Sequence, residues 1–223
     1  MYFLAPIIEK QEKEQKEKEK ELKEQALQLQ IQQNFKSILE NHQKYFQYLV
    51  DLLKYKTPNI KTIEQLVNNF RLLFRASDHN FSSDRFHQFC DGKGPTIIIV
   101  RSTSKYLFGG YASTSWHSKD SYSFAPGSFL FSLDKQTVHN IYRNEKEAIG
   151  GFKDRGPVFG DRDEHDLILS WKKYPEEPNR SELGVTYSLP ADVSYKSMTA
   201  KSYLGGSYKF AIEEYEVFAV KIN

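Results

Sequence analysis

The sequence predicts an α+β protein that is mainly β: a two-sheet antiparallel β-sandwich flanked by short helices and preceded by a long, charged N-terminal helix. Residues 9–24 are almost entirely Glu, Lys and Gln, whereas the chain after Phe70 is rich in aromatic residues, Gly and Ser. In that second part, short β-prone segments follow one another between turn residues. No long helices alternate with these segments, which favours antiparallel sheets over a parallel sheet.

The totals restrict the class of protein. A chain of 223 residues suits one domain, or one domain with an appendage. A single Cys excludes an internal disulfide framework and indicates a reducing, cytoplasmic environment. The formal charge of +2 provides no field to attract nucleic acid or an acidic membrane. No apolar run of about 18 residues occurs, so we expect a soluble protein without membrane insertion.

Residues 1–30 are predicted to form a charged helical arm. The stretch "EKQEKEQKEKEKELKEQ" consists of strong helix formers, and Glu and Lys recur at the three- and four-residue spacings that stabilise an exposed helix. Apolar residues are nearly absent before Leu22. The arm is therefore expected to be solvated, and it can extend the reach of the protein or pair with a partner helix.

Residues 31–75 are predicted to form a helical entrance to a β-rich body at residues 76–223. Apolar residues here recur four and three positions apart in turn: Ile31, Phe35, Ile38, His42, Tyr45, Leu49 and Leu52. Neighbouring apolar residues widen the stripe, which favours docking on a globular surface over a two-stranded coiled coil. Pro58 ends this helix, and a second short amphipathic helix runs from Ile63 to Leu73 or Phe74.

The stretch "NFSSDRFHQFCDGKGPTIIIV" predicts a third short helix followed by a buried strand. Ser82 suits the N-cap position, and Gly92 and Gly94 suit the left-handed end of the helix. Pro95 prevents the helix from resuming.

Three functional alternatives apply to this stretch. Cys90 lies on the apolar face of the helix, where burial would suppress nucleophilic catalysis with His87. A phosphate-binding loop requires strand, glycine loop and helix in that order, whereas here the helix comes first. A redox-sensing thiol at Cys90 stays open as a minor alternative.

The β-rich body contains a series of candidate strands: "PTIIIVRS", "YLFGGYAS", "GSFLFSLD", "QTVHNIYR", "EAIGGF", "HDLILSW", "LGVTYSL" and "GGSYKFAIEEYEVFAV". A hairpin turn is expected at Asp134–Lys135. A bulge near Glu213–Glu214 would bring the two halves of the last strand onto one face. Paired glycines such as Gly109–Gly110 indicate bulges or close backbone approach.

The acidic residues do not form a recognisable active site. The segment 161–166, "DRDEHD", lacks the spacing of a calcium loop and is interpreted as an exposed loop. Glu213, Glu214 and Glu216 neighbour one another on a strand and so do not define a pair of catalytic carboxylates. We therefore predict no catalytic residue, no metal site and no cofactor, and a protein that is not an enzyme.

An ordered series of motifs resembles the TLDc domain of oxidation-resistance proteins and related eukaryotic proteins: "LLFRASDHNFSSDRFHQFCDGKGPT", "FGGYASTSW", "FLFSLD", "GPVFGDRDEHDLILS" and "YKFAIEEYEVF". The likeness runs from about Phe35 to Asn223, which makes residues 31–223 one TLDc-like domain. Helical arms before this domain are common in protist members. The segment "GDRDEHD" departs from the family pattern, so a loop that shapes a partner surface is expected to differ.

The resemblance implies a two-sheet sandwich without an established catalytic centre. The family signature positions carried over by motif, with a structural or interaction role, are Asp91, Gly92, Lys93, Gly94, Pro95, Gly109, Gly110, Tyr111 and Glu216. Members are associated with protection from oxidative stress, and several bind and regulate the vacuolar-type proton-pumping ATPase (V-ATPase).

The expected function is therefore a protein-interaction module with V-ATPase subunits as partners, in the cytoplasm or at endomembranes through the pump. The alternative is a structural component of a cytoskeletal or ciliary (axonemal) assembly. This alternative rests on the charged arm, because a helix that is polar all round is stable only when it is long, paired or docked.

Overall fold

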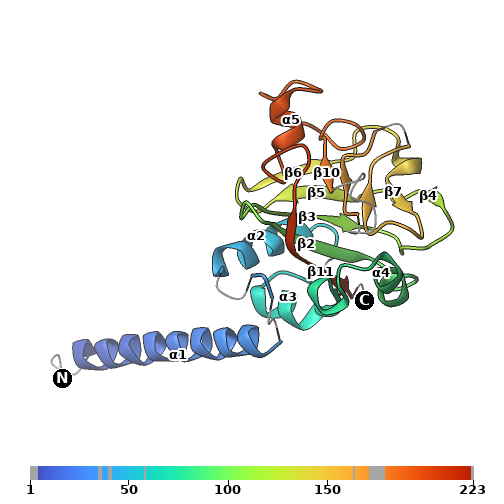
Figure 1. The fold of residues 1–223 in the computed structure, drawn as a ribbon. Helices are drawn as coiled ribbons and strands as arrows, with labels where there is room; N and C mark the ends of the chain where they lie inside the picture. The colour runs from blue at the N-terminus through green and yellow to red at the C-terminus, as the bar shows by residue number, and fades with distance from the viewer. Residues whose placement is uncertain are drawn as a thin grey trace.

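The computed structural model describes residues 5–34, 37–39, 42–57, 59–162, 164–170 and 179–221. It consists of two stacked antiparallel sheets, with a helical layer on the outer face of the larger sheet (Figure 1). The predicted fold class is therefore confirmed. The structure adds that the helical entrance is a layer of the same body, packed on the sheet.

The larger sheet has six strands in the order β1-β11-β2-β3-β5-β6, and every neighbouring pair is antiparallel. Its strands are β1 (Phe70–Arg75), β2 (Thr96–Ser102), β3 (Leu107–Ala112), β5 (Phe129–Ser132), β6 (Thr137–Asn140) and β11 (Ile212–Val220). The C-terminal strand β11 lies between the edge strand β1 and β2, so it is hydrogen-bonded on both sides.

The smaller sheet has five short strands in the order β10-β9-β8-β7-β4, also antiparallel. Its strands are β4 (Ser121–Ser123), β7 (Ile149–Gly151), β8 (Val158–Phe159), β9 (Leu167–Ile168) and β10 (Arg180–Ser181).

Alternation along β2 assigns the two faces of the larger sheet to two separate cores. Ile98 and Val100 face the smaller sheet, where they join the inter-sheet core. Ile97 and Ile99 point the other way into a second core shared with the helices. Both faces are covered, in agreement with the run of buried β-branched residues at 96–100 of β2.

The helices differ in how they meet the body. Their bounds are α1 (Ala5–Asn34), α2 (Gln43–Leu53), α3 (Ile63–Asn69), α4 (Ser83–Cys90) and α5 (Met198–Ser202), with 3₁₀ turns at Ser77–His79 and Glu145–Glu147. Helix α1 extends away from the sandwich, whereas α2 and α3 lie on it (Figure 1). Within the described residues, no helix is both long enough and apolar enough to cross a membrane.

Three predictions about helices and strands were wrong in detail. The heptad-like stripe does not lie on one helix, because α1 ends at Asn34 and α2 begins at Gln43. Its described apolar members pack on the sheet as expected, whereas Phe35 and Pro58 lie outside the described residues. The second short helix ends at Asn69, and Phe70–Arg75 is a strand. The candidate strand "LGVTYSL" is a loop that follows β10.

Several local predictions are confirmed. The Ser82 hydroxyl caps α4 by accepting the backbone N–H of Arg85. Gly92 and Gly94 both have positive φ, at +70° and +77°. A turn joins β5 to β6 at residues 133–136, and the register of β11 shifts between Ile212 and Glu214.

Candidate functional site

Glu216 joins the helical layer to the larger sheet. Its side chain is 1 % exposed, and Oε2 accepts a hydrogen bond from Ser37 Oγ at 2.6 Å and from the Ile38 N–H at 3.2 Å. Oε1 forms an ion pair with Arg75 Nε at 2.8 Å. Burial raises the pKa of Glu216, and the Ser37 and Arg75 partners oppose that shift.

Gly109 lies in the same cross-strand row as Glu216. Glu216 pairs with Ile99, and Ile99 pairs with Gly109. A Cβ on Gly109 would collide with the backbone oxygen of Ile98 and would approach Phe131 Cζ to 2.7 Å. The row therefore leaves no room for a side chain at Gly109.

Gly110 and Tyr111 serve packing on opposite faces of the sheet. A Cβ on Gly110 would lie 2.6 Å from Phe159 Cζ of the smaller sheet, so the missing side chain lets the two sheets approach. Tyr111 is buried in the helix-facing core and stacks on Phe129, with ring centroids 5.2 Å apart. Gly110 therefore serves the contact between the two sheets, whereas Tyr111 serves the core between the larger sheet and the helices.

The segment Asp91–Pro95 is an ordered connection between α4 and β2. The Gly92 N–H donates to the Trp116 carbonyl at 3.1 Å, and the Gly94 N–H donates to Ser115 Oγ at 2.9 Å. The Lys93 N–H donates to the Cys90 carbonyl at 3.3 Å, and the Pro95 carbonyl accepts from the Val220 N–H. The segment therefore ties α4 to the loop after β3 and to β11.

His87 is buried and connects the C-terminal end of α4 to the loop after β7. Its Nδ1 lies 2.8 Å from Asp91 Oδ1, and its Nε2 lies 2.8 Å from the Phe152 carbonyl and 3.1 Å from that of Arg155. Cys90 is fully buried, and burial raises the pKa of its thiol far above the usual range. The two side chains therefore have separate structural environments and do not form a nucleophile–base pair.

The acidic segment 161–166 is not the exposed loop that the sequence predicted, because Asp161, His165 and Asp166 are buried, each with different partners. Asp161 accepts from the Asn144 amide, and Glu164 binds Lys196 and Tyr195. His165 Nε2 lies 3.2 Å from the hydroxyl of Tyr122. Asp163 lies outside the described residues, and among the residues described no group of three or more His, Cys, Asp or Glu could hold a metal ion.

Asp166 has a distinctive environment. It is completely buried and accepts four backbone N–H groups: those of Gly184, Val185 and Tyr187 on Oδ1, and that of Thr186 on Oδ2, at 2.7–3.3 Å. Burial raises the pKa of the carboxyl to about 7, and the four N–H groups act in the opposite direction. The carboxyl thereby determines the shape of the loop 184–187.

A surface cluster covers the outside of that loop. We call it the Tyr–Arg surface and define it as Tyr142, Arg143, Tyr195 and Lys196. The Tyr142 hydroxyl donates to the Gly184 carbonyl at 2.6 Å, and Arg143 Nε donates to the Val185 carbonyl. The Arg143 guanidinium lies over both tyrosine rings, 5.2 and 5.7 Å from their centroids.

The Tyr–Arg surface combines exposure with order. Tyr142 is 54 % exposed and Tyr195 is 45 % exposed, yet both hydroxyls are hydrogen-bonded. Tyr and Arg are enriched at the residues that dominate protein–protein binding. Because these side chains are already ordered, binding would cost little further conformational entropy. This is the candidate docking site of the body.

Sequence reasoning did not identify this surface, because its members come from two distant segments and are supported by a separate loop. Tyr142 and Arg143 follow β6, the loop 184–187 follows β10, and Tyr195 precedes α5. Glu164, in the segment that departs from the family pattern, holds Tyr195 and Lys196 in place at 2.9 Å each. That departure was the one indication in the sequence, since it predicted a different loop near a partner surface.

Comparison with known proteins places this arrangement in a family. Residues 32–221 match the TLDc domain. A local alignment with MTOR-associated protein MEAK7 of Danio rerio shows 38 % identity over 64 residues, which is 29 % of this chain and 14 % of that protein. The human protein of the same name is 27 % identical over 88 residues, or 40 % of this chain and 19 % of that protein.

A shorter alignment with TBC1 domain family member 24 of Xenopus laevis shows 36 % identity over 45 residues, 20 % of this chain and 8 % of that protein. The aligned part of this chain thus spans less than a fifth of each of these relatives. The match to the TLDc domain, by contrast, covers the helical layer and both sheets from end to end, and so this chain belongs to the TLDc domain family.

Proposed function

We propose that this chain is a non-catalytic protein-interaction module that binds and regulates the V-ATPase, with a link to protection from oxidative stress. The observation that carries the proposal is the TLDc match over residues 32–221. The partners of the buried ionisable groups support it. Glu216 and Asp166 both use their carboxylate oxygens to hold the fold together, which leaves neither of them available for chemistry.

The Tyr–Arg surface is our candidate for the contact with the pump. It is exposed, aromatic and cationic, and the Asp166 loop beneath it holds it in one shape. Tyr195 and Lys196 lie in the segment that leads into α5, and Figure 1 shows α5 on the other side of the sandwich from α1. The body and the arm can therefore contact different subunits of one assembly.

Adding the purified chain to purified V-ATPase tests the proposal. The double variant Tyr195→Ser/Lys196→Glu removes an exposed ring and reverses a charge on the Tyr–Arg surface. Tyr55→Ser/Lys56→Glu is the matched control, because Tyr55 and Lys56 are an adjacent, exposed Tyr–Lys pair after α2. We expect the chain to bind the pump and to change its rate of ATP hydrolysis, the first variant to lose both effects, and the control to keep them.

Unchanged hydrolysis together with no co-sedimentation of the pump would overturn the V-ATPase proposal. Affinity purification from cells then decides between two other assemblies. The exposed arm favours a cytoskeletal or axonemal assembly, which predicts recovery of tubulin or axonemal proteins. The relative MEAK7 is named as MTOR-associated, so recovery of mTOR with this chain would favour that association instead.

A further inference from the structure

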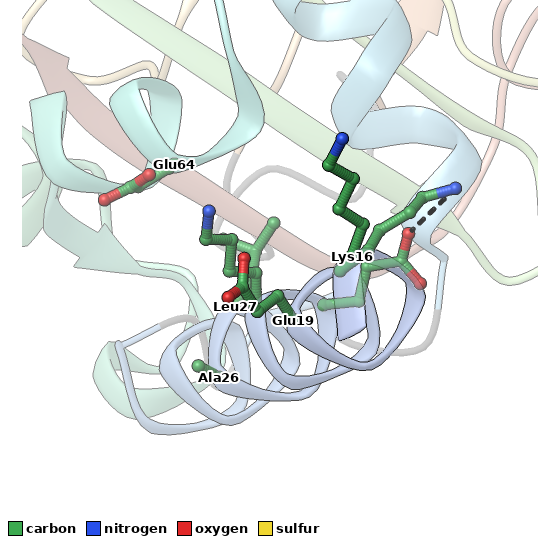
Figure 2. Close-up of a pocket in the computed structure, with 8 residues that line it drawn as sticks. Lys16, Glu19, Ala26, Leu27 and Glu64 are labelled. Carbon is green, nitrogen blue, oxygen red and sulfur yellow. Dashed lines mark ion pairs between the residues drawn. The ribbon is translucent and has the colours of Figure 1, made fainter. Parts of the chain in front are cut away.

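Helix α1 presents a side that no part of the described body covers. Residues 8–26 are all exposed, including Leu22, which is 60 % exposed. The helix meets the body near its C-terminal end, where Leu27 is half-buried and Ile31 is 1 % exposed. Figure 2 shows the groove on the opposite side of α1, which faces the body, where Lys16 and Leu27 of α1 and Glu64 of α3 line the same space.

The uncharged residues of the arm follow a heptad pattern. Between Glu9 and Gln25 every residue is Glu or Lys except Gln11, Gln15, Leu22 and Gln25. Together with Ile8 and Leu29, these residues fall at the two seam positions of a single heptad frame, three and four residues apart in turn. Lys18 is the one charged residue at a seam position. The charged arm therefore contains a seam about 30 Å long that is uncharged except at Lys18.

This seam points away from the body. With about 100° between successive residues of a helix, Leu27 and Ile31 fall on the side opposite the line through Ile8, Leu22 and Leu29. Ile8 and Leu29 are 52 % and 55 % exposed. A partner helix can therefore lie along the seam without displacing α1 from α3.

The positions that flank the seam carry one sign of charge. They are the sites at which paired helices exchange ion pairs, and in this arm they include Glu12, Glu14, Glu19 and Glu21. Two copies of α1, whether parallel or antiparallel, would place Glu opposite Glu. Like charges at these positions are unfavourable, so the pattern disfavours self-pairing.

We propose that α1 pairs along this seam with a helix of a different chain that carries Lys or Arg at its flanking positions. Glu14 already forms an ion pair with Lys10 at 3.9 Å, but both side chains are mostly exposed and the pair is readily exchanged. With apolar residues at Ile8, Leu22 and Leu29 and glutamine at most of the other seam positions, the seam contributes modest affinity. The flanking charges then decide which partner binds.

Two designed helices of about 28 residues, or four heptads, test the proposal without knowledge of the natural partner. Both have Ile and Leu at the seam positions; one has Lys at all flanking positions and its twin has Glu. Each is labelled and titrated with the full chain at low salt, and fluorescence anisotropy reports binding. We expect the Lys helix to bind at least about tenfold more tightly than its twin, with weaker binding at high salt.

Two triple variants distinguish the effect of the charges that flank the seam from the effect of the net charge of the arm. Glu12→Lys/Glu19→Lys/Glu21→Lys reverses flanking charges, whereas Glu9→Lys/Glu17→Lys/Glu24→Lys makes the same change in net charge on the rest of the helix. We expect the first triple variant to lose the preference for the Lys helix and the second to keep it. Circular dichroism confirms that both variants stay folded.

Three results would overturn the proposal. One is that both triple variants weaken binding of the Lys helix equally, which would show that only the net charge of the arm matters. Another is that neither designed helix binds the chain. The last is a homodimer of the chain, seen by analytical ultracentrifugation, that dissociates when Leu22 is replaced by Glu. None of these results depends on whether the body binds the V-ATPase, so the two proposals succeed or fail separately.

Discussion

Ser37 Oγ donates a 2.6 Å hydrogen bond to Glu216 Oε2, although 179 residues separate the two in sequence. This bond joins the segment between α1 and α2 to the strand β11, and Arg75 on the neighbouring strand β1 balances the charge of Glu216. The Glu216→Gln variant would place an amide N–H₂ against donors and remove the buried carboxylate that pairs with Arg75. We expect the free energy of unfolding, measured in urea, to fall by about 3 kcal/mol.

The matched control is Glu145→Gln, an exposed site where we expect a change below about 0.5 kcal/mol. Ser37→Ala should cost about 1 kcal/mol in the wild type and less in the Glu216→Gln background, because the bond is already lost. Fully additive costs for the two substitutions would contradict this account. Amide exchange in α2 is expected to rise more than exchange in β2, since the Ser37–Glu216 hydrogen bond holds the helical layer on the sheet.

Asp166→Asn tests whether the Asp166 carboxylate orders the loop 184–187 beneath the Tyr–Arg surface. An amide has one acceptor oxygen, so its N–H₂ must face either the Thr186 N–H or the three N–H groups that Asp166 Oδ1 accepts. We expect a loss of about 3 kcal/mol in the free energy of unfolding. Limited proteolysis should also show faster cleavage in the loop 184–187.

Asp154→Asn is the control for Asp166→Asn, because Asp154 is exposed and the substitution is chemically identical. If both variants are equally stable, Asp166 does not shape the loop. If Asp166→Asn is destabilised but keeps a protease-resistant loop, the carboxylate stabilises the body without ordering the Tyr–Arg surface.

The architecture of this chain was predictable because its elements depend on local patterns. The run Ile97–Val100 between Pro95 and the turn after Ser102 could only be a buried strand, and Ser82 with Gly92 delimited α4. Phe70–Arg75 was mistaken for helix because its apolar residues also fit a helical period. Pairing with β11 decides its conformation, and such a long-range contact overrides local propensity.

Two buried histidines predict how stability depends on pH. Burial lowers the pKa of His139 and of His165 to about 4, whereas the unfolded side chains titrate near 6.5. Between these values the unfolded state binds protons that the folded state does not, so the free energy of unfolding falls as pH decreases from 6.5 to 4. We expect about 2–3 kcal/mol from each histidine.

Asp166 acts in the opposite direction over nearly the same range, since its folded pKa of about 7 lies above the unfolded value of 3.8. The histidine contribution is therefore measured as the difference in pH dependence between wild type and His139→Asn. The Asn amide can replace Nδ1 of His139 as donor to the Ser188 carbonyl. Identical pH profiles for the two proteins would contradict a neutral, buried His139.

The candidate site was less predictable than the fold. Glu216 was selected by its place in a family motif, but nothing in the sequence indicated that its partners would be Ser37 and Arg75. Tyr142 and Tyr195 are unremarkable as single residues, and they become a surface only when the Asp166 loop brings their segments together. Their function depends on tertiary contacts that no local pattern contains.

Cys90 provides the last prediction, which decides the redox-sensor alternative. The thiol is fully buried, and burial raises its pKa, so the reactive thiolate is scarce in the folded state. We expect the native chain to react with Ellman's reagent at least about 100-fold more slowly than the Ser104→Cys variant in a Cys90→Ala background, where the new thiol is exposed. Unfolding in urea should remove the difference. Rapid modification of native Cys90 would contradict the structural role and restore the redox-sensor alternative.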